Sequence, residues 1–218
     1  SLYVSRDIEL RDISERMVQD RVVVLPMIEQ RPGRTIHIDE REATIDAFQD
    51  NVVIRGGAVI KDFRMVGKID DNDLISFNVM NNGVKGRHTA LIPLGDKQVT
   101  LTFQPIRYKR EVFLRNNKPV ITYHLDFLLT SDRSIEYTPK HYEEIVKLEE
   151  AFTRLALKEH NRFYRKCVAR GWDVAGVKDA LQRYLPDYPQ KGDVLKEVDV
   201  QFVIHSKFMY PSHITESY

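Results

Sequence analysis

An uninterrupted helical stretch, residues 139–170, constrains the fold of this chain more than any other feature. After Pro139 neither proline nor glycine occurs until Gly171, and Thr138 is a favourable residue for the N-cap. Apolar residues recur at intervals of three and four, which predicts one amphipathic helix. At about 1.5 Å per residue it would be on the order of 48 Å long, enough to brace a whole sheet. The predicted core-facing stripe consists of Ile145, Leu148, Phe152, Leu155, Ala156, Phe163 and Cys167.

Three stretches with a two-residue period predict the sheet on which this helix packs. Apolar and polar side chains alternate in residues 97–113 and again in residues 120–130, with the turn-forming sequence "RNNKP" between them. A third alternating stretch, residues 197–210, closes the chain, and a shorter helix is expected over residues 173–185. The order strand, strand, helix, helix, strand predicts an α+β fold in which the helices pack on an antiparallel sheet.

The beginning of the chain predicts a smaller mixed α/β unit. Short strands are expected over residues 21–30 and 34–40. A hairpin with "KDFR" at its turn is expected over residues 51–70, and a short helix follows it. We therefore expect two domains, a partial N-terminal and middle domain over residues 1–82 and a C-terminal domain of sheet and helices over residues 83–218.

Composition and charge exclude several classes of protein. The 33 Lys and Arg against 32 Asp and Glu give a net charge of +1, so no global field favours nucleic acid, and we expect no nucleic-acid partner. No apolar run approaches the roughly 18 residues of a membrane span, and no signal peptide opens the chain. Because the chain begins with Ser1, we expect a processed or trimmed product. The single cysteine, Cys167, excludes an internal disulfide and a cysteine-rich metal site.

The sequence gives no positive case for catalysis, for a cofactor or for a metal. Gly56, Gly57 and Gly67 do not fit a phosphate-binding glycine motif, and a bulge or a close strand crossing explains them better. The acidic run "DDND" lacks the glycine and the glutamate of a calcium loop. The histidines never occur at an HxxxH or HExxH spacing, although strand faces could bring His124 and His205 together.

Residues 107–118 interleave cationic with aromatic side chains, a pattern that can bind nucleic acid or an anionic surface. Solubilising charge on an exposed hairpin tip is the simpler alternative, because no wider basic field surrounds the stretch. The candidate partner surface consists of Arg107, Tyr108, Lys109, Arg110, Arg115 and Lys118.

The stretch "GGAVIKDFRMVGKID", residues 56–70, closely resembles a motif of the Ger(x)C family, the lipoprotein C subunits of spore germinant receptors in bacilli and clostridia. Further landmarks similar to those of the family follow in order: a strand "ITYHLDFLLTSDRSIEY", the segment "ARGWDVAGVKDALQRYLPDYPQ" and a closing strand "VLKEVDVQFVIHS". The resemblance extends from about residue 50 to the C terminus. The matching positions, which we predict to be architectural, are Gly56, Gly57, Gly67, Glu136, Asp173, Gly176 and Pro186.

The resemblance implies a non-enzymatic role in nutrient-induced germination. Members of the family are held on the outer face of the spore inner membrane by an N-terminal lipid and act with two membrane subunits. Those two subunits are the expected partners, together with the lipid bilayer through an anchor absent from this chain, and receptor assembly or signal coupling is the expected role. Confinement to the membrane plane would let protein contacts of modest affinity hold the subunits together. The alternative is a general extracytoplasmic lipoprotein that binds an envelope component such as peptidoglycan.

Overall fold

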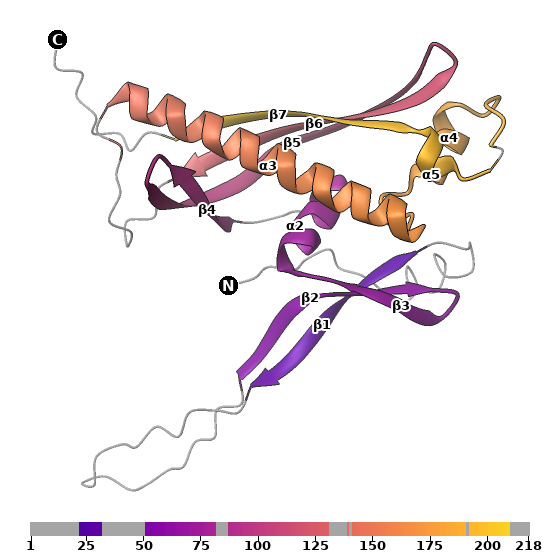
Figure 1. Ribbon diagram of the computed structural model, residues 1–218, viewed down its shortest axis with the longest axis horizontal. Coiled ribbons are helices and arrows are strands. Elements are labelled where there is room, and N and C mark those ends of the chain that lie inside the picture. Colours follow the sequence, from indigo (N-terminus) through magenta and orange to yellow (C-terminus); the bar gives the residue numbers. More distant parts are fainter. Residues whose placement is uncertain are drawn as a thin grey trace, which may run out of the picture.

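The described residues fold into two sheets with helices between and beside them (Figure 1). The computed structural model describes residues 22–31, 51–81, 87–130, 139, 141–190 and 192–209. The first sheet has the order β1-β2-β3 and is antiparallel, with β1 (Val23–Arg31), β2 (Asn51–Lys61) and β3 (Arg64–Ile69). The second sheet has the order β4-β5-β6-β7, with β4 (His88–Leu94), β5 (Lys97–Arg115), β6 (Lys118–Thr130) and β7 (Asp199–Phe208).

The predicted hairpin of the first sheet is confirmed as β2 and β3. Its two-residue turn consists of Asp62 and Phe63, which have φ angles of 49° and 59°. Left-handed conformations at both positions match the right-handed twist of the flanking strands. The strand expected over residues 34–40 lies outside the described residues, as does the predicted domain boundary between residues 82 and 83.

The second sheet confirms the predicted pair of long antiparallel strands, β5 and β6. Strand β7 departs from the expected arrangement because it lies parallel to β6. The long helix α3 (Tyr142–Arg170) connects the two strands, and such a crossover returns the chain to the same end of the sheet and makes a parallel neighbour. Strand β4 was not predicted. Its sequence "HTALIPL" contains a proline, which is tolerated at the edge of a sheet, and Thr89, Leu91 and Pro93 are exposed there.

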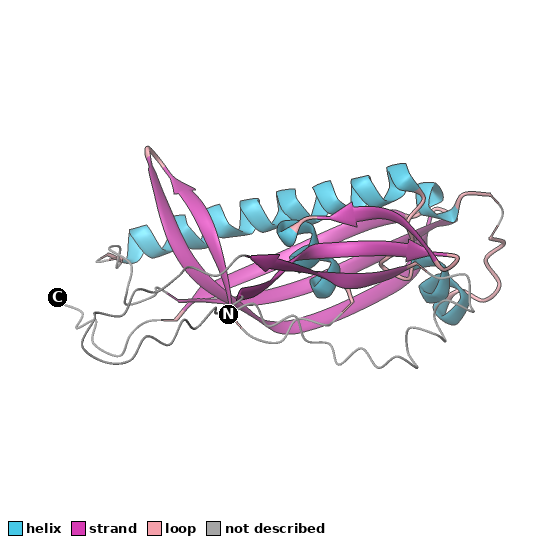
Figure 2. Ribbon diagram, turned by 90° about the horizontal axis from the view of Figure 1, so that it is seen from below, coloured by secondary structure: helices cyan, strands magenta, loops and turns pink. Residues whose placement is uncertain are grey.

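Helix α3 covers one face of the second sheet and runs along most of its length (Figure 2). It begins three residues later than predicted, because Pro139 is buried outside the helix and His141 is the N-cap. Five residues of the predicted stripe are buried, and Leu155 and Ala156 pack partly buried against the same core. The apolar faces of β5, β6 and β7 supply the other half of this core, so the predicted α+β class is confirmed. The five buried residues are Ile145, Leu148, Phe152, Phe163 and Cys167.

Three short helices complete the fold of the part of the chain that the structure describes. Helix α2 (Asp71–Met80) follows β3 directly and lies between the first sheet and α3 (Figure 1). Helices α4 (Val177–Tyr184) and α5 (Val194–Glu197) lie between α3 and β7 in sequence, at one end of the second sheet. No helix in the described part of the chain is both long and apolar enough to cross a membrane.

Candidate functional site

The candidate site is the junction where the first sheet and α2 meet the C-terminal end of α3. Gly56 and Gly57 allow strand β2 to approach its neighbours closely. Gly56 has a φ of +59°, and a Cβ at this position would overlap the backbone carbonyl of Ile69. The N–H of Gly56 donates to Asp71 Oδ1 at 2.5 Å, which ties β2 to the first turn of α2. A Cβ on Gly57 would come within 2.6 Å of Val24 Cγ1 on β1. The glycine pair therefore sets how tightly the helix follows the hairpin.

Gly67 on β3 brings the hairpin against the only tryptophan of the chain. The indole ring of Trp172 lies over Gly67 so closely that a Cβ there would overlap the ring. Trp172 follows Gly171, which ends α3 in the left-handed conformation, and its N–H donates to the carbonyl of Cys167 at 2.9 Å. Trp172 is buried, with the Arg170 guanidinium 5.6 Å from the ring centroid. The end of α3 thus rests directly on the first sheet.

Polar contacts join α2 to α3 across the junction. Asp73 is fully buried, and its carboxylate pairs with Arg162 at 3.0 Å and with Lys166 at 2.5 Å, both on α3. The side-chain amide of Asn81 donates to the carbonyl of Val174 at 3.0 Å, just beyond the end of α3. An arrangement of α2 on α3 that separated Asp73 from these cations would leave its buried carboxylate unpaired, which is costly. The contacts therefore fix the register of α2 on α3.

A buried histidine belongs to the same junction. Nδ1 of His160 on α3 lies 2.9 Å from the hydroxyl oxygen of Ser76 on α2, and both residues are buried. The ring lies 5.6 Å from that of Phe202 and 6.4 Å from that of Phe127, measured between centroids. Burial lowers the pKa of His160 from 6.5 to about 4, so the imidazole is neutral at pH 7.

We expect His160 to make stability fall at mildly acidic pH. The unfolded chain takes up this proton near pH 6.5 and the folded chain only near pH 4, so the stabilisation is complete above pH 6.5 and decreases as pH falls towards 4. Between pH 7 and pH 5 the free energy of unfolding should fall by about 2 kcal/mol from this group. Urea unfolding at both pH values should show this fall in the wild type and in His205→Gln, whose histidine is exposed, and a clearly smaller fall in His160→Gln, where the burial-lowered pKa of His88 still contributes. An equal fall in His160→Gln would contradict this role.

Asp173 and Gly176 organise the turn from α3 into α4. The Asp173 carboxylate accepts from the N–H groups of Val177 at 2.7 Å and of Lys178 at 2.9 Å. Burial raises the pKa of this carboxyl, while the two hydrogen bonds oppose the shift. Gly176 has a φ of +63° and immediately precedes the helix. The helix predicted from residue 173 therefore begins at Val177, because Asp173 caps its first turn from outside.

Residues 55–208 match the family described as "Spore germination B3/ GerAC like, C-terminal". The chain belongs to this family. The resemblance stated from its sequence motifs is confirmed, and the matched range contains most of β2 and all of β3, α2 and α3, but not β1.

A solved structure shows the same fold as this Spore germination B3/GerAC-like chain. It is described as the crystal structure of the GerBC protein and is 16% identical in sequence, with a TM-score of 0.68. The match covers 95% of this chain and 62% of the GerBC chain, so this chain spans less than two thirds of that relative. The curated proteins contain no match to the chain.

In this germination-family chain, the six residues of the candidate partner surface lie on different faces. A bulge between Pro105 and Arg107 shifts the alternation of β5, so that even-numbered rather than odd-numbered side chains point to the core after it. After the bulge, Tyr108 and Arg110 lie on the face that α3 covers, and the Tyr108 hydroxyl donates to the carbonyl of Met80 at 2.9 Å. Arg107 and Lys109 lie on the opposite face, which we call the outer face.

The outer-face cations are exposed and make surface ion pairs. Arg107 lies 3.7 Å from Asp126, and Lys109 lies 2.6 Å from Glu111. His124 Nε2 is also 3.1 Å from Glu111, and hydrogen bonds from Lys109 and His124 hold the pKa of Glu111 below its usual value. Such exposed pairs contribute little to stability, so partner contacts can replace them at small cost.

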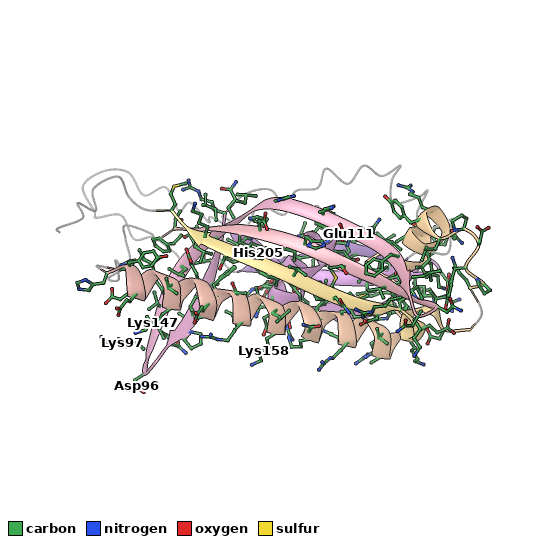
Figure 3. All side chains as sticks on the ribbon, turned by 90° about the horizontal axis from the view of Figure 1, so that it is seen from above. Asp96, Lys97, Glu111, Lys147, Lys158 and His205 are labelled. Atoms are coloured by element: carbon green, nitrogen blue, oxygen red, sulfur yellow. The ribbon has the colours of Figure 1, made fainter. Side chains whose placement is uncertain are left out.

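The remaining predicted positions lie elsewhere. Arg115 and Lys118 flank the exposed turn of the β5–β6 hairpin, where Arg115 pairs with Asp199 at 2.8 Å. Pro186 is exposed after α4, and Glu136 lies outside the described residues. His124 and His205 share the outer face as suggested, and Figure 3 shows His205 and Glu111 over that sheet. No group of three or more potential metal ligands occurs within the residues that the structure describes.

Sequence reasoning missed the most connected residues of the junction. Asp73 stands in "DDND", which was interpreted as a helix cap, and Asp70 does cap α2 by accepting from the Asp73 N–H at 2.8 Å. Nothing local distinguishes the buried Asp73 from its exposed neighbours. Trp172 was a usable signal, because a tryptophan side chain buries a large apolar area.

Proposed function

We propose that this chain is a non-catalytic portion of a germinant receptor C subunit that acts in receptor assembly or signal coupling. Membership of the germination family over residues 55–208 is the observation that carries the proposal. In the full-length protein a lipid anchor would hold it on the outer face of the spore inner membrane, where two membrane receptor subunits are its partners. Because confinement to the membrane raises the effective concentration of the subunits, contacts of modest affinity suffice to hold them together.

The outer face of the second sheet is the contact surface we propose for these subunits. Its polar part consists of Arg107, Lys109 and their carboxylate partners, and its apolar part includes Ile106 and Val203, which are 58% and 36% exposed. Exposed apolar groups among mixed charges are typical of transient protein interfaces. Because α3 and the core occupy the other face, a partner can bind here without disturbing the fold.

A pull-down from detergent-solubilised spore membrane tests the proposal. The tagged 218-residue chain is the bait, and mass spectrometry identifies the retained proteins. We expect the wild type to recover both membrane subunits, and the double variant Arg107→Ala/Lys109→Ala to recover about tenfold less. The matched control is Lys147→Ala/Lys158→Ala, which removes two exposed cations from the side of α3 away from the sheet (Figure 3) and should recover as much as the wild type.

The possible outcomes distinguish a failure of the proposed receptor role from a failure of the proposed contact surface. Recovery that is equal for both double variants would support the receptor role and reject the outer face as its contact. Failure of the wild type to recover subunits from membranes shown to contain them would reject the receptor role. Saturable binding of the chain to isolated peptidoglycan would then identify it as a general envelope-binding lipoprotein.

A further inference from the structure

A cavity of about 400 Å³ lies between α2, α3 and strands β4 to β6. This volume falls in the range of small-molecule sites in proteins. The cavity is lined by residues from both sides of the junction, since Ile75 and Ser76 belong to α2 whereas Leu155 and His160 belong to α3. Its apolar lining comes mainly from Ile75, Leu91, Phe103, Phe127, Phe152 and Leu155.

His160 supplies a polar atom beside this apolar lining. The side chain is 4% exposed, and its Nδ1 is held by the hydroxyl of Ser76. Its Nε2 is buried and has no hydrogen-bond partner among the described residues. A buried polar atom without a partner is costly, and native proteins usually supply one. Because less than 1 Å² of Nε2 is accessible to water, an incoming molecule with a hydroxyl or amide group could satisfy this nitrogen only after the side chains that cover it shift.

Charge restricts the ligand further. Of the described residues that line the cavity, Glu159 alone carries a charge, and it is already paired with Arg162 at 2.9 Å. A ligand anion would meet no described cation in the lining, and a charged group of either sign would lose its hydration against phenylalanine and leucine side chains. An uncharged ligand avoids both costs.

We propose that this cavity binds a small, uncharged, mainly apolar molecule, aromatic or branched, with one hydrogen-bonding group that reaches His160 Nε2. The ligand would contact α2 and α3 together and so stabilise the junction by mass action. Its binding would couple a chemical signal to the contact between the two sheets. This site does not depend on the receptor contact of the outer face, from which the core of the second sheet separates it.

Benzyl alcohol and toluene are suitable probes, because they share the aromatic ring and differ in the hydroxyl group. Titration of the isotope-labelled chain, followed by amide chemical shifts, should show saturable binding of benzyl alcohol with shifts centred on the cavity. Ala156→Leu, which fills the cavity, should weaken binding about tenfold, whereas Leu157→Phe, which enlarges an exposed residue of α3, should bind like the wild type. Ile75→Phe fills the same cavity from α2 and replaces Ala156→Leu if that variant does not fold.

The hydroxyl contact has its own test. The ratio of the dissociation constants of toluene and benzyl alcohol should fall about fivefold in His160→Phe, because the variant keeps an aromatic ring but removes the ring nitrogen that would pair with the hydroxyl. Unsaturable shifts in the wild type, or unchanged affinity in both cavity-filling variants, would overturn the proposed site. An unchanged ratio in His160→Phe would overturn the role of His160 in recognition.

Discussion

Alanine at Gly56 is expected to destabilise the chain by about 3 kcal/mol or more. An L residue at a φ of +59° costs about 1 to 2 kcal/mol by itself. The added Cβ would also overlap the carbonyl of Ile69, which is backbone in the neighbouring strand and cannot rotate away. Relief of the overlap would separate β2 from β3 and break the hydrogen bond from Gly56 to Asp71. Equilibrium urea unfolding, followed by circular dichroism and by Trp172 fluorescence, measures the effect.

Gly95 provides a matched control for this substitution. It has the same φ of +59°, but a Cβ there would meet nothing within 4 Å. Gly95→Ala should therefore cost only about 1 to 2 kcal/mol, the conformational part of the effect. The difference between the two losses in the free energy of unfolding measures the part that depends on the close approach of β2 to β3. Equal losses at both positions would show that Gly56 is required only for its backbone conformation.

Regular side-chain patterns made much of the fold predictable. The long helix followed from the apolar residues at intervals of three and four and from the absence of proline and glycine between 140 and 170. The β5–β6 hairpin followed from two-residue alternation on both sides of "RNNKP". Such local signals decide which elements form, since each apolar face must be buried against another.

Features that depend on contacts between distant segments were not predictable from these patterns. The bulge after Pro105 reverses the facing of β5, so simple alternation cannot show that Arg107 points outward while Tyr108 points inward. The parallel pairing of β7 depends on how far α3 carries the chain back along the sheet. The burial of Asp73 depends on α3 residues 89 and 93 positions later, as the contacts with Arg162 and Lys166 show.

Replacement of Asp73 by asparagine should cost about 2 to 3 kcal/mol and weaken the junction before the rest of the fold. Asparagine keeps the shape of the side chain but removes the charge that balances Arg162 and Lys166. Loss of one partner from a fully buried pair costs about 3 to 5 kcal/mol. The value is lower here because the two cations are 43% and 32% exposed and retain part of their hydration.

Asp193→Asn is the matched control, because Asp193 pairs with Lys196 at 3.0 Å with both side chains exposed. This substitution should cost less than about 0.5 kcal/mol. In Asp73→Asn, the fluorescence of Trp172, which lies at the junction, should change at lower urea concentration than the helical circular dichroism. Coincident transitions at a reduced midpoint would mean that Asp73 stabilises the whole fold rather than the junction. Equal stability of the two variants would show that the charge of Asp73 carries no energetic weight, so that other contacts, including Asn81 with Val174 and Ser76 with His160, would hold α2 on α3.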